Sequence, residues 1–302
     1  MTNFRTPNRT TSLVLSLAAY VVATAVAVGV VYAEPFGSML YDFAVADVAA
    51  TLLVFFVGAA LRNASIYDPY WSLAPIVIAA GLWLLTVPEV PGRAIVVSAL
   101  VGAWGVRLTY NFYSGWSGLD HEDWRYDALR KKHGKLFFFV NLTGIHLMPT
   151  VLVFLGCLPL FAIFGPGPAQ DLGILDLVGL TIMGSGIALE GFADSQLRQF
   201  IRQQKTREPG DKPALLAHGL WGRCRHPNYL GEITFWWGLY IFSLAHDLSY
   251  WWTGAGALLI HLLFVTISIP MIEKRMRARR PQYDEYASRI RSLWPFPRSI
   301  SE

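Results

Sequence analysis

Long apolar stretches recur along this 302-residue chain. A helix needs roughly 20 apolar residues to cross the hydrocarbon core of a bilayer. We expect eight membrane-spanning helices, at about residues 12–33, 44–62, 72–88, 94–113, 136–164, 173–197, 228–246 and 251–271. Only 15% of the residues are charged, whereas a soluble domain carries about 25%. The sequence therefore predicts an all-α, polytopic membrane protein with about eight transmembrane helices.

Two of these stretches need comment. The first follows Arg5 and Arg9, as a signal peptide would, but its length and its poor cleavage sequence favour a retained helix. The stretch at 136–164 contains Pro149 and Pro159, which predict a tilted or kinked helix.

Basic residues lie on one side of the expected spans. If the N-terminus is cytoplasmic, every one of the 25 Lys and Arg residues except Arg93 falls on the cytoplasmic side. Cytoplasmic loops of membrane proteins are enriched in Lys and Arg. We therefore expect both termini in the cytoplasm and, in a bacterium, a location in the inner membrane. The net charge of +4 indicates contact with membrane lipids or another anion, and no soluble basic domain is present to bind nucleic acid.

Cysteine, histidine and glycine residues give no cofactor motif. Cys157 and Cys224 lack disulfide or metal-ligand spacing, although the arginines beside Cys224 predict a lowered pKa for its thiol. His146 and His261 lie singly in apolar stretches, so we expect no metal site. The glycine-rich segment 184–191 lies inside a predicted helix, where it is typical of close helix packing rather than nucleotide binding.

The stretch at 173–197 ends in ionisable residues. Glu190, Asp194 and Arg198 are spaced by four, so they share one helix face, and Arg202 extends that face. A helix that leaves the membrane accounts for the two arginines, but Glu190 lies about two turns deeper. Ionisable groups inside a membrane are costly and commonly functional. This face is therefore a candidate binding site.

A second polar group leads into the stretch at 228–246. The segment GRCRHPNYLGE places a proline in the first turn of a helix, directly after basic residues. A helix N-terminus flanked by arginines can bind an anion, whereas arginines alone would only mark the cytoplasmic side. The candidate residues here are Arg223, Arg225, His226, Asn228, Tyr229 and Glu232.

The segment SIYDPYWSLAP at 65–75 joins an Asp-Pro pair to aromatic residues. A turn at the membrane interface explains this composition. Alternatively, Asp68 is a carboxyl at the edge of an aromatic pocket, where burial would keep it protonated near neutral pH.

Three C-terminal segments together resemble the steroid 5-alpha-reductase superfamily, including its bacterial branch. HGLWGRCRHPNYLGEITFWWGLY at 218–240 resembles the C-terminal signature of that family, DSQLRQF at 194–200 its Asp-x-x-x-Arg segment, and PQYDEYASRIRSLWPF at 281–296 its closing region. The resemblance covers about 190–297, and it extends more weakly over 60–135 through YDPYW and RLTYNFYSGW.

This resemblance implies seven core membrane helices preceded by one extra helix within 1–43, all in a single membrane domain spanning 1–302. It implies that the half at 170–302 binds NADPH and that the protein reduces a carbon–carbon double bond conjugated to a ketone in a steroid-like or other lipophilic substrate. The family's cofactor residues correspond to Asp194, Arg198, Asn228 and Glu232, with Arg107 as a further match. We add the neighbouring candidates Glu190, Arg202, Arg223, Arg225, His226 and Tyr229.

The resemblance also implies a carboxylate beside a tyrosine near the substrate ketone. Asp68 corresponds to the carboxylate, and Trp104 stands where the family has the tyrosine. Tryptophan cannot donate a proton in this way, so we expect Tyr67, Tyr70 or Tyr110 to do so. A protonated Asp68 would donate a hydrogen bond to the ketone oxygen.

Two other functions fit the sequence. RHPNYLG at 225–231 also resembles isoprenylcysteine carboxyl methyltransferases, which use S-adenosylmethionine. The number of apolar stretches and the YDPYW segment favour the reductase. The other alternative is that the chain is a non-enzymatic, lipid-binding membrane protein. The arginines favour NADPH over NADH, and the sequence specifies neither the substrate nor an oligomeric state.

Overall fold

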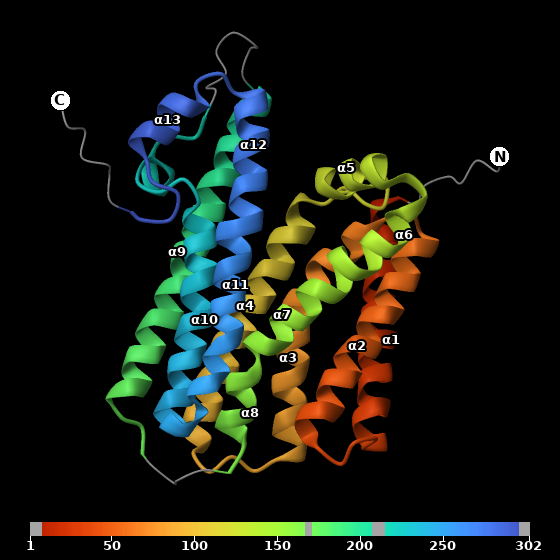
Figure 1. The fold of residues 1–302 in the computed structure, drawn as a ribbon, viewed down its shortest axis with the longest axis vertical. Helices are drawn as coiled ribbons and strands as arrows, with labels where there is room; N and C mark the ends of the chain where they lie inside the picture. The colour runs from red at the N-terminus through yellow and green to blue at the C-terminus, as the bar shows by residue number, and fades with distance from the viewer. Residues whose placement is uncertain (1–7, 167–170, 207–214, 296–302) are drawn as a thin grey trace. The chain divides into compact units, whose positions relative to one another are not determined.

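The computed structural model describes residues 8–166, 171–206 and 215–295, which form helices joined by short connections (Figure 1). Within these residues no strand occurs. The all-α class predicted from the apolar stretches is confirmed. Both chain ends and residues 207–214, part of the connection before the predicted stretch at 228–246, lie outside the described residues.

The chain divides into two compact units, Met1–Ala169 and Gln170–Glu302. The first unit contains α1 (Arg9–Ala33), α2 (Met39–Ala60), η1 (Ala64–Ile66), α3 (Tyr67–Leu85), α4 (Pro91–Gly115), α5 (Trp124–His133), η2 (Gly134–Leu136), α6 (Phe137–Val140), η3 (Asn141–Leu147), α7 (Met148–Gly156) and α8 (Leu158–Phe164). The second unit contains α9 (Ile174–Thr206), η5 (Gly219–Gly222), α10 (Pro227–His246), η6 (Leu248–Thr253), α11 (Gly254–Leu263), η7 (Phe264–Ser268), α12 (Ile269–Arg279) and α13 (Tyr283–Arg289).

Among the described residues, seven helical stretches are long and apolar enough to cross a membrane. They are Arg9–Ala33, Met39–Ala60, Ala64–Leu85, Pro91–Gly115, Trp124–Phe164, Ile174–Thr206 and Leu248–Arg279. The stretch expected at 228–246 forms the 20-residue helix α10, which is not one of the seven because polar residues such as Asn228 and Glu232 make it less apolar. The protein is therefore a polytopic membrane protein with about seven spans.

The helical stretch that contains 136–164 is interrupted, as its prolines predict. The π-helical segment η3 ends at Leu147, and α7 then begins with Pro149 in its first turn. The helix is interrupted again at Cys157, and α8 follows with Pro159 in its first turn. Proline lacks a backbone N–H and its ring crowds the preceding turn, so a regular helix cannot continue through either position.

In the first unit, α1, α2 and α3 pack around a shared core. This core includes Val54, Ile66, Tyr67 and Trp116. The hydroxyl of Tyr20 on α1 donates a 2.5 Å hydrogen bond to the carbonyl of Ile66, directly before α3. The N-terminal helix α1 is thereby fixed to the other helices of its unit, packing chiefly on α2.

In the second unit, α9 and α10 approach backbone to backbone. A Cβ atom built at Gly231 of α10 would lie 2.7 Å from the carbonyl oxygen of Gly186 and 2.7 Å from the Cβ of Glu190. Gly238 meets Met183 in the same way further along. Small residues permit such close contact between membrane helices. The packing role predicted for the glycine-rich segment 184–191 is confirmed at Gly186, whereas Gly184 has nothing within 4 Å, and the contact sets Glu190 directly against α10.

Candidate functional site

The ionisable face predicted on α9 is largely buried within the second unit. Glu190 and Asp194 are 5% and 6% exposed, Arg198 is half-buried, and Arg202 is exposed. Because Glu190 lies against Gly231, this face turns toward α10. Carboxyl groups are seldom buried in an apolar bundle without a specific use. The deeper end of the face therefore remains a candidate binding site.

Helix α10 contributes the second predicted group. It begins at Pro227, directly after His226. Glu232 is 3% exposed, and its carboxylate accepts a 2.8 Å hydrogen bond from Nε1 of Trp236. The half-buried ring of Tyr229 stacks on His226, with ring centroids 5.5 Å apart. Since α9 packs along α10, the residues predicted from two separate stretches come together in one unit.

The segment before α10 folds back onto α9. The backbone N–H of Leu220 donates to Oε1 of Gln196 at 2.9 Å, and Nε1 of Trp221 donates to the carbonyl of Ala193 at 3.0 Å. Arg223 follows this anchored segment and is exposed. The segment thus presents one guanidinium to solvent close to the start of α10.

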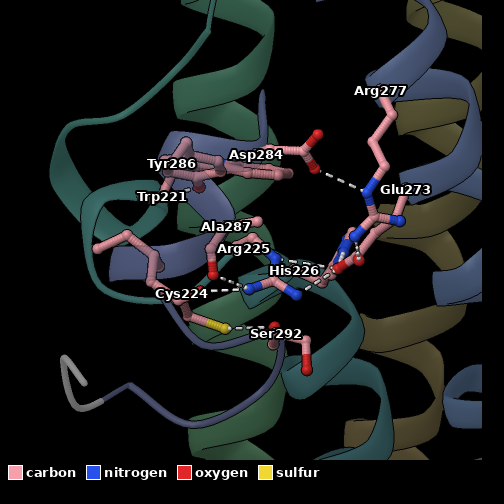
Figure 2. Close-up of polar contacts among 11 residues, drawn as sticks. Trp221, Cys224, Arg225, His226, Glu273, Arg277, Asp284, Tyr286, Ala287 and Ser292 are labelled. Carbon is pink, nitrogen blue, oxygen red and sulfur yellow. Dashed lines mark hydrogen bonds and ion pairs between the residues drawn. The ribbon is translucent and has the colours of Figure 1, made fainter. Parts of the chain in front are cut away.

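Arg225 and His226 lie in a buried ion network, with both side chains turned toward Glu273 of α12 (Figure 2). Nε and Nη2 of Arg225 donate to one carboxylate oxygen of Glu273 at 2.9 and 2.6 Å. Nη1 donates to the carbonyls of Ala287, at 3.1 Å, and Ile290. Nε2 of His226 lies 3.2 Å from the same carboxylate oxygen. These contacts give Arg225 a structural role, and its binding of a cofactor phosphate stays a prediction.

The same region holds the C-terminal segment over the start of α10. The backbone N–H groups of Arg225 and His226 donate to the carbonyls of Arg291 and Ser292, each at 3.0 Å. Together with the ion pair between Arg225 and Glu273, these contacts form what we call the C-terminal clasp. The clasp holds the two residues that directly precede α10, and so fixes the start of the helix that carries Asn228 and Glu232.

Sequence reasoning missed Glu273. The only feature of the sequence that could have indicated it is its place as an acidic residue at the start of the basic run EKRMRARR at 273–280. Its partner Arg225 lies 48 residues earlier, so no helical spacing connects the two. A further long-range contact, from the hydroxyl of Tyr286 to the carbonyl of Trp221 at 2.6 Å, supports the same closure.

Cys224 is packed into the clasp. It is 2% exposed, and its thiol donates to the carbonyl of Ser292 at 3.1 Å. Burial raises the pKa of the Cys224 thiol, and the nearby Arg225 opposes this effect only in part. The lowered pKa predicted from the flanking arginines is therefore wrong, because loss of water outweighs the charge of an arginine already paired with Glu273.

In the first unit, Asp68 pairs with a tyrosine from a distant segment. Asp68 lies in the first turn of α3 and is half-buried. The hydroxyl of Tyr126 on α5 donates a short hydrogen bond to Oδ1 of Asp68. The guanidinium of Arg125 lies 5.4 Å from the ring centroid of Tyr126 and adds a positive charge beside the pair. Asp68 therefore lies in a helix and not in the turn that the Asp-Pro pair can also indicate. Its hydrogen bond with Tyr126 was not predicted from the sequence.

Polar contacts fix the start of α5 against the start of α3. The carboxylate of Asp123 caps α5 by accepting from the backbone N–H of Arg125 at 2.8 Å. The N–H of Asp123 donates to the hydroxyl of Ser65 at 2.8 Å, and Glu122 accepts from the N–H of Ala64 at 2.8 Å. These bonds set the position of the tyrosine on α5 relative to the carboxyl on α3.

Two of the tyrosines expected beside Asp68 make other contacts. The hydroxyl of Tyr70 donates to Oδ1 of Asp47 at 3.1 Å. The hydroxyl of Tyr67 lies 2.8 Å from Oγ1 of Thr150. A catalytic part for Tyr70 stays a prediction, but its hydroxyl is not bonded to Asp68.

Three further predicted positions lie on α4. Tyr110 is 67% exposed, Trp104 is fully buried, and Arg107 is half-buried. Tyr110 therefore does not provide a shielded proton donor. The structure gives the place beside Asp68 to Tyr126, which the sequence analysis did not name. Asp123 in HEDWRYDAL is a residue type that caps helices, so the start of α5 could have been predicted from the sequence. No sequence pattern indicated that α5 contacts α3.

The fold and these buried polar groups define a polytopic helical membrane protein with ionisable residues held at helix ends. The chain belongs to the family described as a protein of unknown function (DUF1295), which matches residues 54–290. It is similar to an uncharacterized protein of Schizosaccharomyces pombe, with 26% identity over 273 residues that cover 82% of this chain and 79% of the yeast protein. No solved structure matches the chain.

Proposed function

We propose that this protein is a membrane-embedded, NADPH-dependent reductase of a carbon–carbon double bond conjugated to a ketone in a steroid-like or other lipophilic substrate. The observation that carries the proposal is the hydrogen bond between Tyr126 and Asp68. The resemblance calls for a carboxyl beside a tyrosine at the substrate ketone, and the sequence alone left the tyrosine unassigned.

The chemistry assigned to this pair is acid catalysis. Reduction adds a hydride to the β-carbon of the enone and a proton to the α-carbon, so the double bond becomes a single bond while the ketone is retained. NADPH, when bound, supplies the hydride. A protonated Asp68 donates from its other oxygen to the ketone oxygen, where negative charge develops, while the hydrogen bond from Tyr126 to Oδ1 holds the carboxyl in place. Arg125, which is ion-paired with Asp123 at 2.8 Å, lies beside this pair.

The residues of the second unit fit a dinucleotide by their chemistry. Arg202 and Arg223 are exposed, and among the described residues neither has an ion-pair partner. Guanidinium groups bind phosphates well because their donors match phosphate oxygens. Asn228 and Glu232, with Asp194 and Arg198 on α9, offer partners for carboxamide and ribose hydroxyl groups. Arg225 is committed to the clasp, where it would support this site by fixing the start of α10.

We further propose a cytoplasmic location for both termini, in the inner membrane of a bacterium. The distribution of basic residues supports it. This topology requires α10 to cross the membrane as an eighth helix, packed along α9 and shielded from lipid. A cofactor from the cytoplasm would then reach the arginines directly, and an apolar substrate would enter from the bilayer.

The proposal is tested by reduction of hydrophobic enones. Purified full-length protein in nanodiscs is incubated with NADPH and, in turn, progesterone and a long-chain alkyl cyclohexenone. Loss of NADPH absorbance and a product two mass units heavier than the enone are followed together. We expect reduction by the wild type and a large loss in Asp68→Asn. Binding of NADPH without reduction of either enone, or equal rates in the variant, would contradict the assignment.

A further inference from the structure

A large cavity lies between α1, α2 and α3, inside the first unit. Its volume is about 670 Å³, within the size range of small-molecule sites. Most of its wall is apolar and comes from residues such as Val28, Ala27 and Ile78. Val21 and Leu84, also in the wall, are 71% and 80% exposed, so the cavity opens on the outer surface of helices that span the membrane. An apolar molecule could therefore enter from lipid.

One side of this cavity is polar. Asp47 of α2 and the tyrosines Tyr20 and Tyr70 line it. Asp47 is 6% exposed, and its Oδ1 accepts the 3.1 Å hydrogen bond from Tyr70. Its other oxygen, Oδ2, is buried and has no hydrogen-bond partner among the described residues. A carboxyl group in the wall thus keeps one oxygen unmatched.

An unmatched carboxyl oxygen in an apolar setting is costly, and native proteins rarely leave one without a use. The two buried tyrosines of the cavity wall already use their hydroxyl hydrogens, since Tyr20 donates to the carbonyl of Ile66 and Tyr70 donates to Oδ1 of Asp47. The third tyrosine of the wall, Tyr32, is 70% exposed. A ligand with a polar group at this position would supply the missing hydrogen bond. The remainder of the ligand would face apolar side chains.

We propose that this cavity binds a lipophilic alcohol, with its hydroxyl on Oδ2 of Asp47 and its apolar body between α1, α2 and α3. A hydroxyl suits Asp47 in either protonation state, because it can both donate and accept a hydrogen bond. One buried, unmatched polar atom in a mostly apolar wall fits a molecule with one polar end.

This site is separate from the proposed catalytic pair. Neither Asp68 nor Tyr126 lines the cavity. The family match begins at residue 54, so α1 and Asp47 both precede it. The inference therefore does not depend on the reductase proposal, and a failure of either leaves the other standing.

The test is photocrosslinking of the full-length protein in nanodiscs with a diazirine derivative of geranylgeraniol. Unlabelled geranylgeraniol, its methyl ether and geranylgeranylamine serve as competitors, because they share one apolar body and differ at the polar end. We expect labelled peptides from α1 to α3 and competition by the alcohol at concentrations about 10-fold lower than the ether. Equal competition by alcohol and ether, stronger competition by the amine, or no labelling of these helices would overturn the proposal.

Variants separate recognition from folding. Asp47→Leu is made in a Tyr70→Phe background, because Asp47 also accepts the hydrogen bond from Tyr70 and the leucine alone would leave that buried hydroxyl without an acceptor. With both partners apolar, the protein should fold about as well as the wild type while its preference for the alcohol over the ether disappears. Ala27→Phe fills the cavity from α1 and should abolish labelling. Ala25→Phe is the matched control, because Ala25 is exposed on the same helix and lies outside the cavity wall. Retained alcohol preference in Asp47→Leu, or retained labelling in Ala27→Phe, would contradict the assignment.

Discussion

At the residue scale, the second unit depends on one buried arginine whose donors are matched by the protein. Arg225 and Glu273 are both 8% exposed at their side chains. Taking two charges out of water is expensive, so such a pair is stable only when its remaining donors and acceptors are also bonded. The carbonyls of Ala287 and Ile290 meet this condition for Arg225.

Breaking the clasp should therefore unfold the second unit readily. Glu273→Gln leaves the guanidinium of Arg225 buried without a counter-charge, which should lower the free energy of unfolding by about 3–5 kcal/mol. The matched control is Glu285→Gln, because Glu285 pairs with Arg289 at an exposed position and should lose about 0.5 kcal/mol or less. Denaturant unfolding in detergent measures both, and equal losses would show that the buried pair contributes no more than an exposed one.

The acid pair makes a second prediction at this scale. Tyr126→Phe removes the hydroxyl that bonds Asp68 and should slow enone reduction by about 100-fold. NADPH affinity should not change, because Tyr126 is not among the predicted cofactor residues. Tyr110→Phe is the control on an exposed tyrosine and should retain full activity. A rate in Tyr126→Phe equal to that of Tyr110→Phe would remove Tyr126 from the mechanism.

At the element scale, helix faces were predictable and contacts between distant segments were not. The four-residue spacing of Glu190 and Asp194 correctly placed both on one face of α9, since a helix repeats locally. Tyr126 and Asp68 are 58 residues apart in the sequence. Their contact depends on the hydrogen bond that joins Asp123, at the start of α5, to Ser65, directly before α3. No periodicity in the sequence predicts this contact between α5 and α3.

The close packing of α9 on α10 gives a third prediction. In Gly231→Ala the new methyl group would meet backbone and Cβ atoms at 2.7 Å, which should lower the free energy of unfolding by about 1–3 kcal/mol. Gly184→Ala is the matched control on α9, where nothing lies within 4 Å, and it should be neutral or stabilising by up to about 1 kcal/mol. Thermal unfolding in detergent distinguishes them, and equal stability would show that the helices can separate at no cost.

At the scale of the whole molecule, apolar stretches were enough to predict an all-α membrane protein and most of its spans. Seven of the eight expected stretches form helices that are long and apolar enough to span a membrane, and the eighth, α10, has the length of a span but carries Asn228 and Glu232 near its start. The break in the helix around Cys157 was predictable from Pro149 and Pro159. The division into two compact units depends on packing, which no local pattern in the sequence encodes.

The proposed reductase needs NADPH as the cofactor of the second unit. The most direct measurement is a thermal shift of the purified protein with NADPH, NADH and S-adenosylmethionine side by side. NADPH at about 100 times its dissociation constant should stabilise the wild type by about 2.7 kcal/mol. Glu232→Gln, which keeps an acceptor for Trp236, should lose most of that stabilisation, while the exposed control Asp284→Asn should keep it. Stabilisation by S-adenosylmethionine and none by NADPH would contradict the reductase proposal and make the protein a methyltransferase candidate.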